Sequence, residues 1–307
     1  MKFDVRMPGL THMPGTPEWS HHLDAPDFRR LAAVVDGLGY ETITVPEHLA
    51  MPYFELPRLG AYWTHALSTM AFLCGATTNV RIDATVLVLP YHHPLALAKA
   101  ISTMDVLSGG RVNLSLGVGH AVREFEVLGI PFNERGPRTD EMLEMMKVLW
   151  SEDEPAFHGR FYDVDGLAFE PKPVQQPRPP IHVGGNSPRA LRRAARHEGW
   201  LSNPSRGIVL SEVPEKLEYM RSQPEFAGKE ATFEVYWLRF PEDPTPFDFG
   251  TAGAAGRAAY RDHILEHVAD LQQHGVTKTS LPPAETSSLE EYAEFLQWFA
   301  EEVRPVA

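Results

Sequence analysis

The sequence predicts an α/β fold, a closed (β/α)8 TIM barrel in which helices surround an inner ring of parallel strands. Two observations favour this fold: short apolar segments alternate with helical patterns along the chain, and the composition shows no break across the 307 residues. A third observation argues against the alternative, a doubly wound open sheet. That fold requires a glycine fingerprint after the first strand, whereas Gly9 is followed by a proline-rich loop.

The clearest strand–helix–strand unit spans residues 81–126. Its first strand, 82–89, is β-branched and aliphatic, which is typical of a strand covered by helices on both sides. Helix 94–108 follows, with apolar residues at helical spacing and a pair of glycines after its last residue. A second strand, 112–116, then ends in the glycine-rich turn 117–119. This pattern predicts parallel strands whose carboxyl ends lie together.

The remaining elements repeat this alternation. The expected strands, in chain order, span residues 3–7, 42–45, 82–89, 112–116, 181–183, 200–202, 231–240 and 276–281. The expected helices span residues 28–39, 65–75, 94–108, 139–150, 187–197, 213–222, a segment ending at 275, and 288–303. Ser288 and Glu291 form a capping-box pattern at the start of the last helix.

An insertion separates strands four and five, between about residues 124 and 180. It holds helix 139–150 and then a segment rich in proline and turn residues, which predicts a hairpin outside the core layers. With 43% apolar residues the chain can bury one large core. We therefore expect a single domain over residues 1–307 that carries this insertion.

Charge and cysteine content narrow the class of protein. The formal net charge of −13 argues against nucleic acid and anionic membranes as partners, because both select basic surfaces. The single cysteine, Cys74, lies in an apolar helical run, which predicts a reducing compartment. The amino-terminal residues do not resemble a signal peptide, and no apolar run is long enough to span a bilayer. We expect a cytoplasmic protein.

Polar residues follow several strands, where the sites of barrel enzymes lie. Glu47 and His48 follow the second strand, Tyr91 and His92 the third, and His120 the fourth. A carboxylate beside an imidazole can orient a ligand or move a proton near neutral pH. The alternative for Glu47 and His48 is a loop pair satisfied by backbone groups.

The turn after the fifth strand resembles an anion site. Gly184, Gly185, Asn186 and Ser187 precede Pro188, so the turn offers backbone N–H groups, a side-chain cap and proline at the first helical position. A phosphate suits such a turn, and the following helix carries the basic residues Arg189, Arg192, Arg193 and Arg196. The alternative is an ordinary capped helix with a solvated basic face.

Two other classes of site are not expected. Adjacent histidines such as His92 and His93 point to opposite sides of an extended backbone, and the chain has no HExxH motif or cysteine pair, so we expect no metal. A GxSxG motif is also absent, which argues against a serine hydrolase.

Several motifs in order resemble the bacterial luciferase-like monooxygenase superfamily, and within it the coenzyme F420-dependent oxidoreductases of actinobacteria. The resemblance covers about residues 3–203 well and the rest loosely. The residues that carry it are the Leu-Val-Leu-Pro-Tyr-His-His-Pro run at 87–94, the turns at 107–112 and 117–119, the stretch 124–136, Pro-Lys-Pro-Val-Gln at 171–175, and Ile-His-Val-Gly-Gly at 181–185.

The resemblance implies a bound cofactor whose flavin-type ring lies against the strand ends and whose phosphate lies at the turn after the fifth strand. It also implies a cis peptide bond between Thr85 and Val86 under the ring. It places Glu47 and His48 beside the ring, with His48 as the proton donor or acceptor. Related enzymes that oxidise sugar phosphates place a glutamate shortly after the glycine-rich turn, where this chain has His120 and Ala121. A sugar phosphate is therefore not expected as substrate, and His120 becomes a second proton-transfer candidate. The expected cofactor contacts are Thr85, Val86, Tyr91, Gly117, Gly119, Gly184, Gly185, Asn186 and Ser187.

We therefore expect hydride transfer between coenzyme F420 and a small organic substrate, and the family likeness implies a homodimer. The aromatic residues Tyr53, Phe54, Tyr62 and Trp63 and a lid-like segment at 240–256 suggest a moderately apolar substrate. One alternative is an FMN-dependent monooxygenase. The alternative from another class is a non-catalytic barrel that binds flavin or another ligand without turnover.

Overall fold

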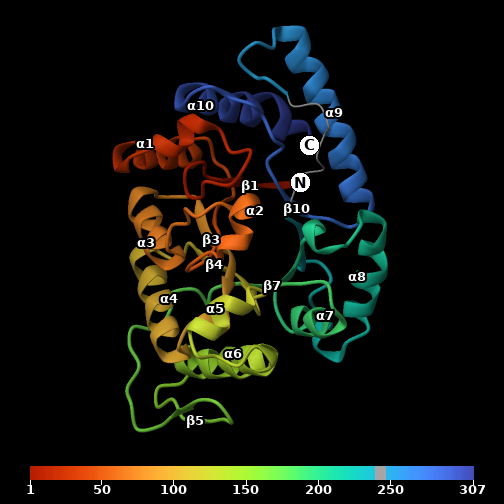
Figure 1. Cartoon of the computed structure of the whole chain (residues 1–307). Coiled ribbons are helices and arrows are strands. Elements are labelled where there is room, and N and C mark those ends of the chain that lie inside the picture. The colour runs from red at the N-terminus through yellow and green to blue at the C-terminus, as the bar shows by residue number, and fades with distance from the viewer. Residues whose placement is uncertain (239–246) are drawn as a thin grey trace.

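The computed structural model describes residues 1–238 and 247–307. Parallel strands close into a barrel in the order β1-β10-β9-β8-β7-β4-β3-β2, with helices around it (Figure 1). This confirms the predicted (β/α)8 architecture. No described helix combines the length and the apolar content that crossing a bilayer requires.

The barrel strands lie where the sequence predicts them. The last two strands are shorter than expected. Residues 239 and 240 of the expected seventh strand lie outside the described residues, and so do residues 240–246 of the expected lid. The strands are β1 (Lys2–Arg6), β2 (Thr42–Val45), β3 (Arg81–Val88), β4 (Val112–Gly117), β7 (Ile181–Gly184), β8 (Gly199–Ser202), β9 (Glu234–Trp237) and β10 (Lys278–Ser280).

Two short helices, α2 and α5, were not expected. Ser288 caps the last helix by accepting the Glu291 N–H at 3.1 Å, but the Glu291 side chain bonds Ser287 instead of closing a capping box. That helix changes to a π-helical turn at Phe299–Val303. The helices are α1 (Ala25–Gly37), α2 (Leu56–Leu59), α3 (Ala66–Ala76), α4 (Pro94–Ser108), α5 (Val122–Val127), α6 (Arg135–Ser151), α7 (Pro188–Ala195), α8 (Val213–Arg221), α9 (Ala254–Gln273) and α10 (Leu289–Trp298).

The insertion between β4 and β7 packs against the helical layer. Its long helix, α6, is joined to α4 by the Trp150 indole N–H, which donates to the Ala98 carbonyl at 3.1 Å. The predicted hairpin is present as β5 (Phe157–His158) and β6 (Asp163–Val164), an antiparallel pair that extends beyond α6 (Figure 1).

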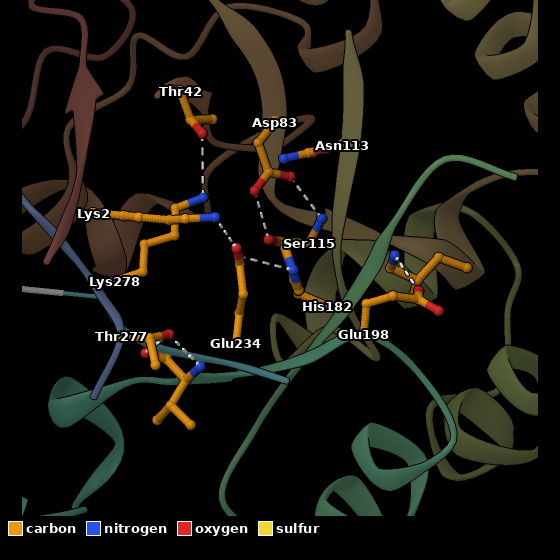
Figure 2. A network of polar contacts seen from close by, with 12 residues as sticks. Lys2, Thr42, Asp83, Asn113, Ser115, His182, Glu198, Glu234, Thr277 and Lys278 are labelled. Carbon is orange, nitrogen blue, oxygen red and sulfur yellow. Dashed lines mark hydrogen bonds and ion pairs between the residues drawn. The ribbon is translucent and has the colours of Figure 1, made fainter. Parts of the chain in front are cut away.

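The inside of the barrel is polar near its amino-terminal end, which we call the floor. Most TIM barrels fill this space with branched aliphatic side chains. Here Asp4 and Lys278 are buried 3.1 Å apart, and Asp83 accepts hydrogen bonds from the Ser115 N–H (2.7 Å) and hydroxyl (2.8 Å). Figure 2 shows Lys278, Asp83 and Ser115 converging with Glu234 from separate strands. The apolar core lies instead between the strands and the helices.

Candidate active site at the mouth of the barrel

The carboxyl-terminal end of the barrel, its mouth, holds a histidine–glutamate pair built from two loops. Nδ1 of His48, after β2, lies 2.8 Å from a carboxylate oxygen of Glu124, in α5. The same carboxylate accepts hydrogen bonds from the Leu49 N–H (2.6 Å), the Ala50 N–H (3.2 Å) and the Tyr91 hydroxyl (3.0 Å). Both carboxylate oxygens are therefore engaged, and the loop after β2 is fixed to α5.

These hydrogen bonds decide which ring nitrogen of His48 carries hydrogen. Burial raises the pKa of Glu124, but the hydrogen bonds from His48, Leu49 and Ala50 outweigh it, so the pKa of this carboxyl lies below its ordinary value. An ionised carboxylate only accepts hydrogen bonds, so Nδ1 of His48 donates. In the neutral ring, Nε2 is then the acceptor atom that can take a proton from a ligand.

Aromatic residues surround the ring of His48. The Trp63 ring lies edge-on at 4.6 Å between centroids and the His120 ring at 5.6 Å, so the structure brings His48 and His120 together. The side chain of His48 is 11% exposed, which leaves part of the ring accessible. Of the other expected aromatic residues, Tyr53 and Phe54 project into solvent, being 91% and 78% exposed.

Glu47 does not pair with His48, so the expected carboxylate–imidazole unit is two separate units. Glu47 accepts hydrogen bonds from the Val88 N–H at 2.6 Å and lies 2.9 Å from Nε2 of His92. It is 5% exposed. Because Val88 ends β3, Glu47 ties the end of β2 to the end of β3 and to the loop beyond it. Its position favours a role in holding the mouth together.

Val86 lies between two glycines of neighbouring strands. A Cβ atom on Gly117 of β4 would lie 2.9 Å from Val86 Cγ2, and one on Gly184 of β7 would lie 3.2 Å from Val86 Cγ1. The register of β3 against β4 shifts between Thr85 and Leu87, and the Thr85–Val86 peptide bond is cis, as the family resemblance implies. The Val86 side chain therefore packs directly on these two glycines, and we call Val86, Gly117 and Gly184 the glycine shelf.

The turn after β7 leads into the capped amino-terminal end of α7. Gly185 has φ +123°, a conformation open to glycine, and the Ser187 hydroxyl accepts the Ala190 N–H at 3.3 Å. The Asn186 side-chain amide donates to the Asn203 carbonyl at 3.3 Å, while its Oδ1 atom is buried without a hydrogen-bond partner among the described residues. The Ser187 hydroxyl can therefore donate to an anion at this turn, whereas the unpartnered Asn186 oxygen can only accept a hydrogen bond.

The arginines of α7 do not support this turn as the sequence suggested. Three of them pair with side chains of other elements: Arg193 with Asp140 of α6 (2.6 Å), Arg192 with the Tyr219 hydroxyl of α8 (2.8 Å), and Arg196 with Glu225 (3.2 Å). Their charges hold α7 to its neighbours. Among the described residues, no three histidine, cysteine or acidic side chains gather closely enough to hold a metal ion.

Residues 1–241 match the family model described as luciferase-like monooxygenase. The chain belongs to this family. An uncharacterised protein of Mycobacterium tuberculosis is 32% identical over 218 residues, 67% of this chain and 74% of that protein. The FMNH(2)-dependent dimethylsulfone monooxygenase of Pseudomonas putida is 32% identical over 176 residues, 56% of this chain and 47% of that enzyme.

Solved structures share the luciferase-like fold over the whole chain. A monooxygenase from Streptomyces bottropensis has a TM-score of 0.78 at 22% identity and covers 99% of both chains. The coenzyme F420-dependent tetrahydromethanopterin reductase of Methanopyrus kandleri has a TM-score of 0.70 at 14% identity, covering 99% of this chain and 98% of that one. At these identities the likeness shows the fold. This luciferase-like protein thus has FMN- and F420-dependent proteins among its relatives and structural neighbours.

Glu124 is the residue of this luciferase-like site that sequence reasoning missed. It was expected as the start of the insertion and of the stretch 124–136, with no functional role, because nothing in the sequence links it to His48, 76 positions earlier. The available signal was that this stretch carries the family resemblance and follows the Gly117–Gly119 turn at a strand end.

Proposed function

We propose that this luciferase-like protein transfers hydride between bound coenzyme F420 and a moderately apolar organic substrate, with His48 as the proton donor or acceptor. The hydrogen bond from His48 Nδ1 to Glu124 carries the proposal, because it leaves Nε2 as the proton-accepting atom at the mouth. The choice of F420 rests on the motif resemblance over residues 3–203.

The residues at the strand ends fit a flat ring with a phosphate tail. In this proposal the ring lies against Val86, whose place over the backbone requires glycine at positions 117 and 184, because Cβ atoms there would crowd its side chain. Two buried oxygens, Thr85 Oγ1 and Asn186 Oδ1, have no hydrogen-bond partner in the described part of the chain, and N–H or O–H groups of a cofactor would satisfy them. In this proposal Tyr91, Gly119 and Gly185 border the cofactor, and the phosphate binds at Asn186 and Ser187.

Coenzyme F420 is a deazaflavin, and when bound it would supply the hydride acceptor or donor. His48 Nε2 then takes or gives the accompanying proton, and the ionised Glu124 stabilises the imidazolium. His120, with its ring centroid 5.6 Å from that of His48, is the second proton-transfer candidate. Trp63 covers one side of His48 and limits the access of water.

A second candidate function is an FMN-dependent monooxygenase. It is favoured by the 32% identity over 176 residues to the FMNH(2)-dependent dimethylsulfone monooxygenase. The same residues would serve the same ring contacts, so geometry does not separate the two cofactors. The homodimer and the cytoplasmic location stay predictions.

Calorimetric titration of the purified protein with F420 and with FMN, each oxidised and reduced, tests the proposal. We expect saturable binding of F420 at one site per chain and much weaker binding of FMN. Binding of FMN without F420 would favour the monooxygenase, and binding of neither would remove the cofactor site altogether.

A matched pair of glycine variants tests where the cofactor lies. Gly117→Ala would bring a methyl group against Val86 and disturb the glycine shelf, whereas Gly37→Ala in α1 meets no atom within 4 Å. We expect Gly117→Ala to weaken cofactor binding about tenfold, the effect of a misplacement costing about 1.4 kcal/mol, and Gly37→Ala to leave it unchanged. Equal affinities in both variants would place the cofactor elsewhere.

A further inference from the structure

A small hydrophobic cluster lies beside the His48–Glu124 pair and is separate from the main core. Its buried members are Val88, Tyr91 and Phe125, and Ile130 and Phe132 pack against them. Phe125 follows Glu124 in α5, and Tyr91 belongs to the turn after β3, so the cluster joins these two elements. We call it the mouth cluster.

Packing fixes the ring of Tyr91 within the mouth cluster. Its centroid lies 5.1 Å from that of Phe125, with 65° between the ring planes, and Tyr91 is 9% exposed. Gly119 has φ +80° and makes room for this packing, because a Cβ atom there would lie 2.6 Å from Val88 Cγ1 and 2.8 Å from Phe125 Cε2. The Tyr91 hydroxyl can therefore reach only a narrow range of positions.

That hydroxyl donates to the Glu124 oxygen that also faces His48. Oε2 of Glu124 lies 3.0 Å from Tyr91 Oη and 2.8 Å from His48 Nδ1, whereas Oε1 accepts two backbone N–H groups. Burial and the nearby carboxylates of Glu124 and Glu47 raise the pKa of Tyr91 well above its ordinary value, so the hydroxyl keeps its proton. Among the described residues, Tyr91 and His48 are the side chains that hold Oε2.

The next residue of the same turn, His92, holds a second carboxylate. Its Nε2 lies 2.9 Å from Oε1 of Glu47, the residue that precedes His48. The turn after β3 therefore contacts Glu124, which is the partner of the His48 ring, and Glu47, which is its neighbour in the chain. Contacts on both sides restrain the backbone and the ring of His48 together.

We infer that Tyr91 is a positioning residue for proton transfer, whose hydroxyl keeps the Glu124 carboxylate turned toward His48 Nδ1. Without this hydroxyl, His48 alone would hold Oε2, and the carboxylate could rotate away from the ring. Misplacement by about 1 Å is enough to slow an enzyme. The effect on turnover rests on the proposed function, whereas the restraint of Glu124 does not.

Tyr91→Phe tests the inference, because it removes the hydroxyl and keeps the ring in the mouth cluster. The matched control is Tyr40→Phe: Tyr40 is also buried, precedes β2 at the floor, and donates to the Leu296 carbonyl at 2.7 Å. The first readout is hydrogen exchange at His48 Nδ1 in the cofactor-free full chain with isotope-labelled histidine, the signal being the one lost in His48→Gln. We expect slow exchange in the wild type and in Tyr40→Phe, and about tenfold faster exchange in Tyr91→Phe.

The second readout is turnover with bound cofactor. In Tyr91→Phe, kcat should fall about fivefold while KM and cofactor affinity stay within about twofold, because the aromatic ring is kept. Tyr40→Phe should keep the wild-type kcat. The inference is overturned by a wild type whose His48 N–H is unprotected, by equal exchange in wild type and Tyr91→Phe, or by faster exchange with unchanged kcat. A wild type that never turns over would refute the proposed function, and the exchange rates would still decide whether Tyr91 restrains Glu124.

Discussion

Two histidine–glutamate pairs lie at opposite ends of the same barrel. At the mouth, His48 and Glu124 are 2.8 Å apart, with side chains 11% and 3% exposed. At the floor, His182 and Glu234 are 3.2 Å apart, with side chains 4% and 21% exposed. The residue types, distances and burial are similar, so the difference between the pairs must come from their surroundings.

The floor pair belongs to a network of opposite charges, whereas the mouth pair does not. Glu234 also accepts from the Lys2 ammonium at 2.6 Å, and Figure 2 shows Lys278 beside it. Burial raises the pKa of Glu234, but His182, Lys278 and Lys2 outweigh it and hold the pKa well below its ordinary value. Besides His48, the described residues give Glu124 only neutral donors. At the floor, opposite charges surround the histidine–glutamate pair; under the proposed function, the mouth pair lacks them and can take part in proton transfer.

Loss of the mouth histidine should have the largest effect. His48→Ala removes the proton-transfer group and should lower turnover about 100-fold or more, with cofactor affinity unchanged because the glycine shelf is intact. The measurement is the rate of cofactor oxidation or reduction with a substrate that the wild type turns over. His22→Ala, an exposed histidine of the loop after β1, is the control. Unchanged turnover would refute the proton role, and a wild-type protein that binds but never turns over would support the non-catalytic barrel.

Loss of the floor histidine should act on stability instead. His182→Ala removes a buried ring and its contact with Glu234, and should lower the free energy of unfolding by about 3 kcal/mol. Turnover per folded molecule should stay within about twofold, since the mouth is untouched. Chemical denaturation and turnover on the same samples check both. Impaired turnover with normal stability would show that the floor takes part in the chemistry.

The floor should also make stability depend on pH in an unusual direction. Burial raises the pKa of Asp4 from 3.8 to about 6, although Lys278 opposes this. A raised pKa in the folded state means that stability from Asp4 is full below pH 3.8 and is lost as the pH rises through 6. From pH 7 to 4.5 the wild type should therefore gain about 2 kcal/mol relative to Asp4→Asn. Denaturation at both pH values checks this, and parallel changes in the two proteins would contradict it.

Neutralising the mouth carboxylate should have the smallest effect of the four. Glu124→Gln keeps the shape but removes the negative charge that stabilises the His48 imidazolium, so turnover should fall about tenfold. The measurement is the rate of cofactor oxidation or reduction. Glu126→Gln, an exposed glutamate of the same helix paired with Arg123, is the control. Unchanged turnover in Glu124→Gln would mean that Glu124 has a purely structural role.

Much of the fold was predictable because its signals are local. Strand β2 lies at Thr42–Val45, as its apolar run predicts, and Ser187 caps α7. The short helix α5 was missed because six residues, Val122–Val127, are too few to show a helical period. Strand β9 was expected to be longer because its alternating pattern continues beyond the pairing with its neighbours.

By itself the sequence determined the alternation of strands and helices, and with it the edge at which His48, His120 and the Gly184–Ser187 turn would meet. Only the tertiary structure decided the pairing, with Glu124 for His48 and His92 for Glu47. It also turned the α7 arginines toward neighbouring helices and placed the Tyr91 hydroxyl on Glu124. The physical reason is that hydrophobic periodicity is written in neighbouring residues, whereas a hydrogen bond across 76 positions depends on how loops from different strands converge.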